Sequence, residues 1–321
     1  MLPNFLCIGA QKCGTTTIAH ILQAHPGVYL ARGGETRFFC DEFQYLGGVQ
    51  RYEIQQFSDW NGQPAVGEKC PEYLYVPGTA QRIFDLVGPR VKLIVALRSP
   101  AQRAFSHYRH NFTMLRESRS FDEALADDAV QVQQGLAAPP PFGYLARGFY
   151  ARQLAEYLNL FAPEQFLFVH FEKDIASDQR GLCEKICTFL EIEKFFPAKL
   201  PFRAGHARLE TLSVRFAEGG SGPSQPTVEI EQRSYRVWRA AGLLQRLLRQ
   251  APRAASSTER TRIHRPSEAL VQFARRFQEN KPKGADLPRE RELAINRRFF
   301  QDDFRRLSEI APLDLSRWLE D

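Results

Sequence analysis

A glycine-rich loop between an apolar segment and a helical segment most constrains the fold of this chain. The apolar run 4–9 ends at a glycine, as a buried parallel strand does, and a helical spacing of apolar residues runs from Thr15 to the stop signal at 25–27. The loop between them, residues 9–17, reads Gly-Ala-Gln-Lys-Cys-Gly-Thr-Thr-Thr. A strand, a tight turn and a helix in this order are typical of the first unit of a parallel α/β sheet.

The alternation of strands and helices continues along the chain. We expect buried strands at 91–97 and 165–171, and helices at about 101–112, 150–161 and 178–190. The sequence therefore predicts an α/β fold with a P-loop-like central parallel sheet of about five strands, covered by helices on both faces.

The character of the sequence changes after Pro197, which suggests how the chain is organised. We place a core at residues 1–200 and expect 201–321 to be a mainly helical extension that completes the same domain. Within this extension we expect a flexible stretch at 201–232 and an amphipathic basic helix at 234–249. A loop at 254–258 and a last helix at about 290–310 follow.

The positive charge of the chain is concentrated in one segment. The 321 residues carry a net charge of +6, but residues 233–265 hold nine arginines and one acid, so the remaining chain is slightly acidic. This basic segment is either a solvated helix with its apolar face on the core or a docking surface for an anionic partner or carrier. Because the surplus of positive charge is confined to this segment and few aromatic residues lie in it, we expect no nucleic-acid partner.

Other features bear on the environment of the protein. No apolar run approaches the ~20 residues that span a bilayer, and no basic leader precedes the first strand, so we expect no transmembrane segment and a cytoplasmic location. The six cysteines show neither paired spacing nor the density of a disulfide framework, which favours free thiols.

The composition of the loop 9–17 is that of a phosphate-binding site. Glycines bring backbone N–H groups close to an anion, and the helix N-terminus adds further donors. A lysine supplies a positive charge and the threonines supply hydroxyl groups. The residues expected to bind phosphate here are Lys12, Cys13, Gly14, Thr15, Thr16 and Thr17; the alternative is a glycine-rich turn without function.

The loop nevertheless differs from a Walker A motif. That motif requires a lysine where this chain has Thr15, and the strand 91–97 is followed by Arg98 instead of an aspartate that would hold Mg²⁺. We therefore expect no metal site. A nucleotide whose transferred group carries less charge than a γ-phosphate is compatible with one lysine in the loop.

Two motifs of the chain resemble those of sulfotransferases that use 3′-phosphoadenosine 5′-phosphosulfate (PAPS). Residues 12–16 resemble the 5′-phosphosulfate loop of that family, and 97–108 match every fixed position of its 3′-phosphate motif, LRxPxxRxxSxY. Three further segments, 35–39, 68–73 and 148–172, are similar to heparan sulfate sulfotransferases and their bacterial relatives. The resemblance runs from about residue 4 to 190 and resumes weakly at 296–319.

The resemblance implies sulfuryl transfer from PAPS to an acceptor hydroxyl by direct in-line displacement without a metal. Negative charge then builds on the phosphate leaving group while the acceptor loses a proton. Lys12 and the threonines are expected to bind the 5′-phosphosulfate, and Arg98 and Ser106 the 3′-phosphate. Tyr150 is expected to line the donor site or else to be a core aromatic. The alternatives for Lys12 and Arg98 are an exposed loop lysine and a salt bridge at the strand end.

The resemblance also implies a set of catalytic residues. Glu35 is the expected general base, and Lys12 and Lys69 are the expected cations near the leaving group and the sulfuryl oxygens. A glutamate on a surface loop is the alternative for Glu35.

One departure from the family pattern affects the surroundings of Glu35. The family has a lysine directly before this glutamate, and this chain has Gly34. Loss of that cation makes Lys69 more important, and Arg32 and Arg37 are candidates to replace it. Glu68 is a candidate partner for Lys69 or for an ammonium group of the substrate.

Other functions remain open at this point. A P-loop kinase acting on a small molecule is one alternative, and a non-catalytic module that binds nucleotides or polyanions is the other. For the sulfotransferase, the acceptor is a glycan, a lipid or a small molecule with a free hydroxyl, because a fold does not determine which alcohol is bound.

Overall fold

The computed structural model describes residues 1–32, 34–135, 142–197, 212–217, 227–232, 259–264 and 268–320. The chain divides into two compact units, and each is described separately. The first unit comprises residues 1–103, 147–205 and 288–321, and the second comprises 104–146 and 206–287.

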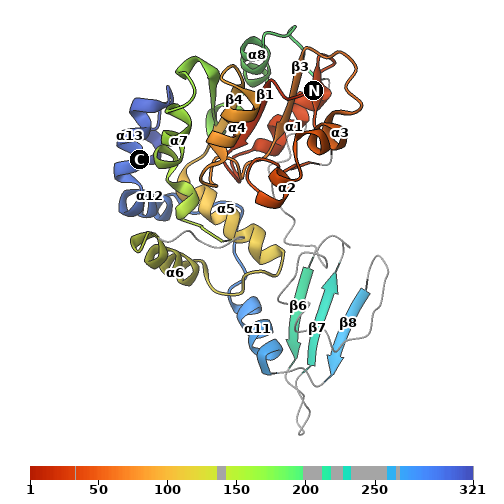
Figure 1. Ribbon diagram of the computed structural model, residues 1–321. Coiled ribbons are helices and arrows are strands. Elements are labelled where there is room, and N and C mark those ends of the chain that lie inside the picture. Colours follow the sequence, from red (N-terminus) through yellow and green to blue (C-terminus); the bar gives the residue numbers. More distant parts are fainter. Residues whose placement is uncertain are drawn as a thin grey trace, which may run out of the picture. The chain divides into compact units, whose positions relative to one another are not determined.

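The first unit contains the expected parallel sheet of five strands (Figure 1). The strand order is β2-β3-β1-β4-β5, and all neighbouring strands are parallel. The strands are β1 (Phe5–Gly9), β2 (Val28–Leu30), β3 (Ala65–Lys69), β4 (Lys92–Leu97) and β5 (Phe166–His170). Strand β1 therefore lies between β3 and β4, which places the segments that follow these three strands at one edge of the sheet.

The burial of these strands follows from their composition. All residues of β1 and β3 are buried, and in β4 only Lys92 at the start is partly exposed. Strands covered on both faces are nearly continuously apolar, as β1 and β4 are. Strand β3 is an exception because its last two residues are Glu68 and Lys69. Buried charged side chains require specific partners, which marks this strand end for closer description.

Helices flank the sheet of the first unit (Figure 1). They are α1 (Thr15–Ala24), α2 (Glu42–Leu46), α3 (Val49–Phe57), α4 (Thr79–Val87), α7 (Tyr150–Leu158), α8 (Gln179–Leu190), α12 (Arg289–Phe299) and α13 (Gln301–Ile310). Short helical turns are η1 (Ala146–Gly148), η2 (Pro163–Gln165), η3 (Phe171–Ile175) and η5 (Ser316–Trp318). The prediction of a single last helix at about 290–310 is wrong in one respect. The chain leaves helical geometry at Phe300 and forms two helices there.

Asn296 of α12 joins the C-terminal helices to the end of β4. Its side-chain oxygen accepts a hydrogen bond from the Ala101 N–H at 3.0 Å, and its amide nitrogen donates to the Ser99 hydroxyl at 3.0 Å and to the Trp318 carbonyl at 2.8 Å. Asn296 is fully buried, so these bonds are protected from water. The segment after residue 288 is thereby part of the unit that carries the loop 9–17.

The second unit combines helices with a small antiparallel sheet. Helix α5 (Pro100–Thr113) begins in the first unit and continues into the second, which also contains α6 (Phe121–Gln133) and α11 (Glu268–Glu279). The sheet has the order β6-β7-β8, with β6 (Leu212–Ala217), β7 (Thr227–Gln232) and β8 (Glu259–His264).

This small sheet corrects the expectation of a flexible stretch at 201–232. Strands β6 and β7 lie within that range, and apolar and polar residues alternate in their sequences, as in Leu-Ser-Val-Arg-Phe-Ala. That period of two is typical of strands, but the glycine- and proline-rich tract between them obscured it. The C-terminal part thus ends in helices, as expected, but three strands precede them.

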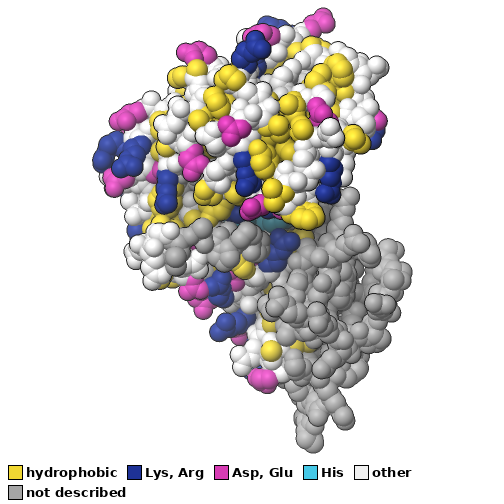
Figure 2. Space-filling model, viewed as in Figure 1, with side chains coloured by type: hydrophobic (Ala, Val, Ile, Leu, Met, Phe, Trp, Pro, Cys, Tyr) yellow, Lys and Arg dark blue, Asp and Glu magenta, His cyan; other side chains and the backbone are white. Residues whose placement is uncertain are grey.

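Most of the basic segment 233–265 lies outside the described residues, including the helix expected at 234–249 and the loop at 254–258. Its described part, β8, is a strand. In the view of Figure 2, basic and acidic side chains are interspersed over the first unit, with exposed hydrophobic side chains between them. This agrees with a sequence in which the surplus of positive charge belongs to one segment. The two interpretations of the basic segment remain predictions.

Among the helices of the described residues, none is both long enough and apolar enough to cross a bilayer. That part of the chain also contains no group of three or more histidine, cysteine, aspartate or glutamate side chains arranged to hold a metal ion.

Candidate functional site

The loop between β1 and α1 has the backbone geometry of an anion-binding turn. Gly14 caps α1 with φ 87°, and no side chain caps the first N–H groups of the helix. The Thr17 N–H donates to the Gly14 carbonyl at 2.9 Å, so the donors suited to an anion are the N–H groups of Thr15 and Thr16. A Cβ at position 14 would lie 2.5 Å from Cδ1 of Ile175, and the φ is unfavourable for any other residue. The structure therefore requires glycine at this position.

Lys12 lies within this turn and has a left-handed backbone conformation, with φ 69°. The neighbouring Gln11 donates a hydrogen bond from its side-chain nitrogen to Oε1 of Glu72 at 3.1 Å. Glu72 is buried and pairs with the buried Arg147, whose Nη1 lies 2.9 Å from the same oxygen. The loop is also joined to β4, because the Ala10 N–H donates to the Ala96 carbonyl at 2.7 Å. These contacts hold the segment that carries the lysine.

Tyr150 connects the loop to the second expected binding segment. Its hydroxyl donates to the main-chain carbonyl of Arg98 at 2.9 Å and lies 3.5 Å from Sγ of Cys13. Tyr150 is fully buried, and burial raises its pKa well above the usual value, so the hydroxyl stays neutral. Tyr150 is thus a core aromatic, one of its two expected roles, and it contacts both segments expected to bind the donor. That it lines a donor site stays a prediction.

Arg98 directly follows β4, and an aromatic ring supports its guanidinium. The carbon at its centre lies 4.4 Å from the ring centroid of Phe171, a cation–π geometry. Glu172 accepts a hydrogen bond from the Ser99 N–H at 3.2 Å, and its other oxygen lies 3.2 Å from Nδ1 of His170. Burial raises the pKa of Glu172, but the hydrogen bond and charge of His170 and the charge of Arg98 outweigh it and lower the pKa overall.

The other two members of the expected donor site described here are Ser106 and Cys13. Ser106 lies on α5, eight residues after Arg98, in the part of that helix that belongs to the second unit. Cys13 is fully buried, which raises the pKa of its thiol to about 11 and keeps it protonated near neutral pH. Cys13 is thus suited to contribute its backbone to an anion site but not a thiolate.

Two of the expected catalytic residues, Glu35 and Lys69, form an ion pair. Lys69 is the last residue of β3, and its Nζ lies 2.8 Å from Oε1 of Glu35. The lysine side chain is 10% exposed and that of the glutamate 39%, so the pair lies at the boundary between the core and solvent. Because β3 is the neighbour of β1, Lys69 is also at the sheet edge that carries the loop 9–17.

The structure gives a backbone reason for the glycine that precedes Glu35. Gly34 has φ 94°, although no atom would lie within 4 Å of a Cβ there, so conformation and not space disfavours a lysine. Arg32, a candidate replacement for the missing cation, instead forms an ion pair with Asp59. Lys69 is therefore the cation seen in contact with Glu35.

Glu68 differs from its expected role. It is fully buried and accepts a hydrogen bond from the Tyr73 hydroxyl at 2.6 Å, with Oγ1 of Thr36 lying 2.8 Å from that hydroxyl. It does not pair with Lys69, whose partner is Glu35. Burial raises the pKa of Glu68 to about 7, against the lowering effect of hydrogen bonds from neighbouring hydroxyl groups. This cluster was not predicted from the sequence, although the tyrosine of the segment 68–73 was a visible signal.

The raised pKa of Glu68 predicts a pH-dependent stability. The native carboxyl binds its proton more tightly than the unfolded one, so its favourable contribution is present below the ordinary pKa of 4.5 and is lost as the pH rises through about 7. The side chain of Glu68→Gln does not titrate. Relative to this variant, the free energy of unfolding of the wild type should therefore fall by about 3 kcal/mol between pH 4.5 and pH 8. Urea unfolding of both proteins at the two pH values measures this, and an equal difference at both would contradict it.

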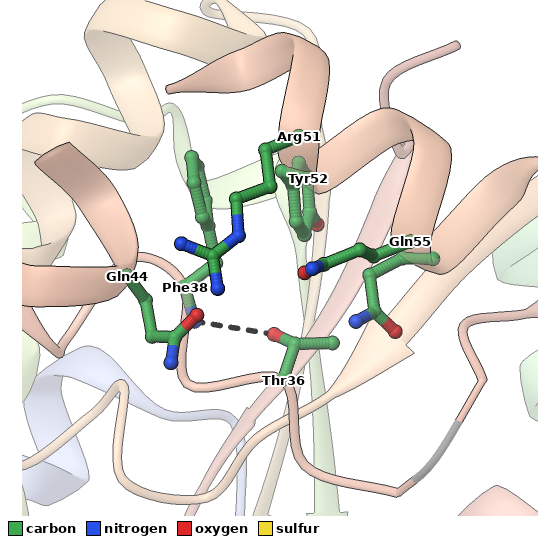
Figure 3. A pocket seen from close by; sticks show the side chains of 7 residues that line it. Thr36, Phe38, Gln44, Arg51, Tyr52 and Gln55 are labelled. Carbon is green, nitrogen blue, oxygen red and sulfur yellow. Dashed lines mark hydrogen bonds between the residues drawn. The ribbon is translucent and has the colours of Figure 1, made fainter. Parts of the chain in front are cut away.

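A small pocket is lined in part by Thr36, the residue that follows Glu35 in the chain (Figure 3). It is a shallow hollow of about 220 Å³, a volume that includes space open to solvent, and its lining combines amide, guanidinium and aromatic groups: Thr36, Phe38, Gln44, Arg51, Tyr52, Gln55 and Gln56. Phe38 and Tyr52 stack with ring centroids 4.1 Å apart. Figure 3 shows the Arg51 guanidinium and the amide groups of Gln44 and Gln55 directed toward the same space. These groups can bind the hydroxyl or anionic groups of a polar molecule.

Comparisons with known proteins agree with the motifs. The model of the sulfotransferase domain matches residues 2–195. The chain is 34% identical over 121 residues (37% of its length) to the membrane-associated sulfotransferase kil1 of Dictyostelium discoideum, of which it covers 25%. It is 30% identical over 222 residues (69% of its length) to the heparan sulfate glucosamine 3-O-sulfotransferase 6 of Homo sapiens, of which it covers 61%.

A solved structure supports the same assignment. The crystal structure of a sulfotransferase from Alicyclobacillus acidocaldarius matches with a TM-score of 0.55 at 34% identity, over 63% of this chain and 86% of the other. The chain spans less than two thirds of the length of the two curated relatives. Because the family model matches more than half of its residues, this chain belongs to the sulfotransferase family.

Proposed function

We propose that this sulfotransferase moves a sulfuryl group from PAPS to a hydroxyl group of an acceptor. The observation that carries the proposal is the hydroxyl of Tyr150, which contacts both the loop of Lys12, at Cys13, and the main chain of Arg98. The donor carries one anionic group at the 5′ position and another at the 3′ position of its ribose, so it needs two separate cationic sites held at a constant distance. A buried tyrosine that joins the two segments supports such an arrangement.

The donor side of the proposed reaction uses charges and backbone donors. The N–H groups at the start of α1 and the cation of Lys12 would bind the 5′-phosphosulfate, and the guanidinium of Arg98 the 3′-phosphate. Ser106 is proposed as a further 3′-phosphate ligand. PAPS supplies the sulfuryl group, with its leaving phosphate as the group on which negative charge increases. Lys12 and the helix N-terminus are suited to stabilise that charge.

The acceptor side of the proposed reaction uses Glu35 and Lys69. The carboxylate of Glu35 takes the proton of the acceptor hydroxyl as the new oxygen–sulfur bond forms and the sulfur–oxygen bond to the phosphate breaks. Once Glu35 is protonated, the ion pair at 2.8 Å loses its charge complement. The ammonium of Lys69 is then available to the negative oxygens of the sulfuryl group, which couples proton removal to electrostatic stabilisation.

The acceptor is proposed to approach from the pocket that begins at Thr36. Its amide and guanidinium groups are suited to a hydroxyl-rich molecule, and one of the similar proteins is named for a glycan, heparan sulfate. A glycan is therefore our first candidate acceptor, with a hydroxyl-bearing lipid or small molecule as the alternatives. A cytoplasmic location and an anionic partner of the segment 233–265 are further proposals.

A binding experiment separates this proposal from a kinase and from an unspecific nucleotide-binding module. Adenosine 3′,5′-bisphosphate should raise the melting temperature of the wild type more than adenosine 5′-monophosphate or ATP with Mg²⁺ does. Arg98→Ala should lower the affinity for the bisphosphate by ~10-fold or more and leave the affinity for the monophosphate nearly unchanged, because only the bisphosphate has a 3′-phosphate. Titration calorimetry measures both affinities.

Two results would contradict the proposed donor site. Stronger stabilisation by ATP with Mg²⁺ favours the kinase, since that ligand has no 3′-phosphate. Equal losses of both adenosine nucleotides in Arg98→Ala would remove the 3′-phosphate contact. Arg180→Ala is a matched control, because that arginine also stacks on an aromatic ring, Phe196, but has no part in the proposed site.

A further inference from the structure

The end of β3 holds the loop of Glu35 at two successive positions. Lys69 binds Glu35 directly at 2.8 Å, and Glu68 reaches Thr36 through the hydroxyl of Tyr73. Two consecutive strand residues therefore hold two consecutive loop residues. The proposed chemistry uses the first of these contacts and leaves the second, which is entirely buried at Glu68 and Tyr73, without a role.

The directions of the hydrogen bonds in this chain follow from the number of protons. Tyr73 has one hydroxyl proton, and it is donated to the carboxyl of Glu68 at 2.6 Å. As long as Tyr73 donates to Glu68, the hydroxyl of Thr36, 2.8 Å from the tyrosine oxygen, is the donor of the bond between them. The same tyrosine oxygen accepts the N–H of Phe39 at 3.5 Å, and the Thr36 oxygen accepts the N–H of Phe38 at 3.3 Å. The phenol thus contacts the first and the fourth residue after Glu35, Thr36 and Phe39, and Thr36 in turn binds Phe38.

We propose that Glu68 and Tyr73 are positioning residues, which fix the loop that presents the Glu35 carboxylate through a buried chain of hydrogen bonds. This inference rests on the proposed function, in which Glu35 takes the acceptor proton. Neither residue contacts the reacting groups. A general base works only within hydrogen-bond reach of the hydroxyl it deprotonates, so a displaced loop lowers the rate of the chemical step more than it weakens donor binding.

The protonation state of Glu68 gives this proposal a testable pH dependence. An ionised Glu68 accepts the Tyr73 proton in a strong charge-assisted bond, and a neutral one accepts it weakly. The groups that face Glu68 are Tyr52 of α3 and Tyr73, and Cys70 lies two residues further along the chain; burial raises the pKa of all three. These groups stay neutral between pH 6 and 8, and the nearby charges of Lys69 and Glu35 pair with each other. Glu68, with a pKa of about 7, is therefore the group of this cluster that titrates in that interval.

The test combines amide hydrogen exchange with kinetics on the full chain. Tyr73→Phe and Glu68→Gln should increase exchange in the peptide that covers residues 34–40. With PAPS and a heparan sulfate oligosaccharide, 4-nitrophenol or 1-hexanol as the acceptor probe, they should lower kcat by about 10- to 100-fold and leave the KM for PAPS nearly unchanged. In the wild type kcat should fall as the pH decreases through about 7, and Glu68→Gln should lack that limb.

A matched control is available in the second unit. Tyr144 is also buried and donates to a buried glutamate, Glu117, at 3.2 Å. Tyr144→Phe should leave the exchange of residues 34–40 and the pH profile as in the wild type. Unchanged exchange in both Tyr73→Phe and Glu68→Gln overturns the positioning proposal, whatever the activity. A limb near pH 7 that persists in Glu68→Gln also overturns it. If the wild type is inactive with every probe while exchange increases in the two variants, the proposed function is rejected and the loop contact is supported.

Discussion

Glu35→Gln is expected to lower kcat by about 10³-fold while the affinity for adenosine 3′,5′-bisphosphate stays the same. The amide keeps the size of the side chain and an oxygen near Nζ of Lys69, but it cannot take a proton from an acceptor hydroxyl. Loss of a positioned general base typically costs 10²- to 10⁴-fold. The effect belongs at the upper part of this range if the ammonium of Lys69 is released only when Glu35 is protonated. Single-turnover transfer of ³⁵S from PAPS to the best acceptor probe measures the chemical step directly.

The control for this substitution is Glu164→Gln, which changes an exposed glutamate of the same unit. It should retain full transfer. Turnover of Glu35→Gln within a factor of about three of the wild type would remove Glu35 from the chemistry. Loss of bisphosphate binding in that variant would instead mean that the glutamate supports the donor site.

Local patterns were sufficient to predict the centre of the first unit. Strands β1 and β4 are apolar runs. Strand β1 ends at a glycine, an arginine directly follows β4, and the segment after each strand is a recognisable motif. The glycine of the loop is required by its φ and by the side chain of Ile175, so its presence in the sequence reflects a backbone constraint. Such features depend on neighbours in the chain, which is why a single sequence can reveal them.

Strands β2 and β3 were not located from the sequence, and their compositions explain this. Strand β2 has three residues, too few for a periodic pattern. Strand β3 ends in Glu68 and Lys69, both buried, which contradicts the apolar run expected of a central strand. Their burial depends on Tyr73 and on Glu35, which lies 34 residues away from Lys69 in the chain. Contacts of that kind arise from strand order and cannot be derived from local periodicity.

The surroundings of Glu35 show the same limit. The glycine before it suggested that a nearby arginine replaces the missing family lysine, but Arg32 pairs with Asp59. The cation in contact is Lys69, because β3 lies next to β2, the strand that precedes Glu35, and both strands end at the same edge of the sheet. Functional residues of this type are found by asking which charged residues end central strands, since the sheet brings those ends together.

Lys12→Ala is expected to lower kcat by about 10²- to 10³-fold, as removal of one preorganised donor from a developing anion typically does. The substitution leaves the backbone problem unchanged, because lysine and alanine both carry a Cβ at φ 69°. The loss should be greater in kcat than in the affinity for adenosine 3′,5′-bisphosphate. Charge on the bridging oxygen increases in the transition state, whereas the N–H groups of α1 still bind the ground-state phosphate. Single-turnover kinetics and titration calorimetry on the same protein separate the two effects.

The comparison with Lys194→Ala decides whether such a loss is specific to the loop. Lys194 is exposed and belongs to the same unit, so its removal changes the net charge equally without touching the proposed donor site. A salt-dependent decrease common to both variants would indicate general electrostatic attraction of the anionic donor. A decrease below tenfold in Lys12→Ala, with Lys194→Ala unaffected, would mean that the N–H groups of α1 stabilise the leaving phosphate without the lysine. A large decrease confined to Lys12→Ala would place the lysine charge on the oxygen that leaves.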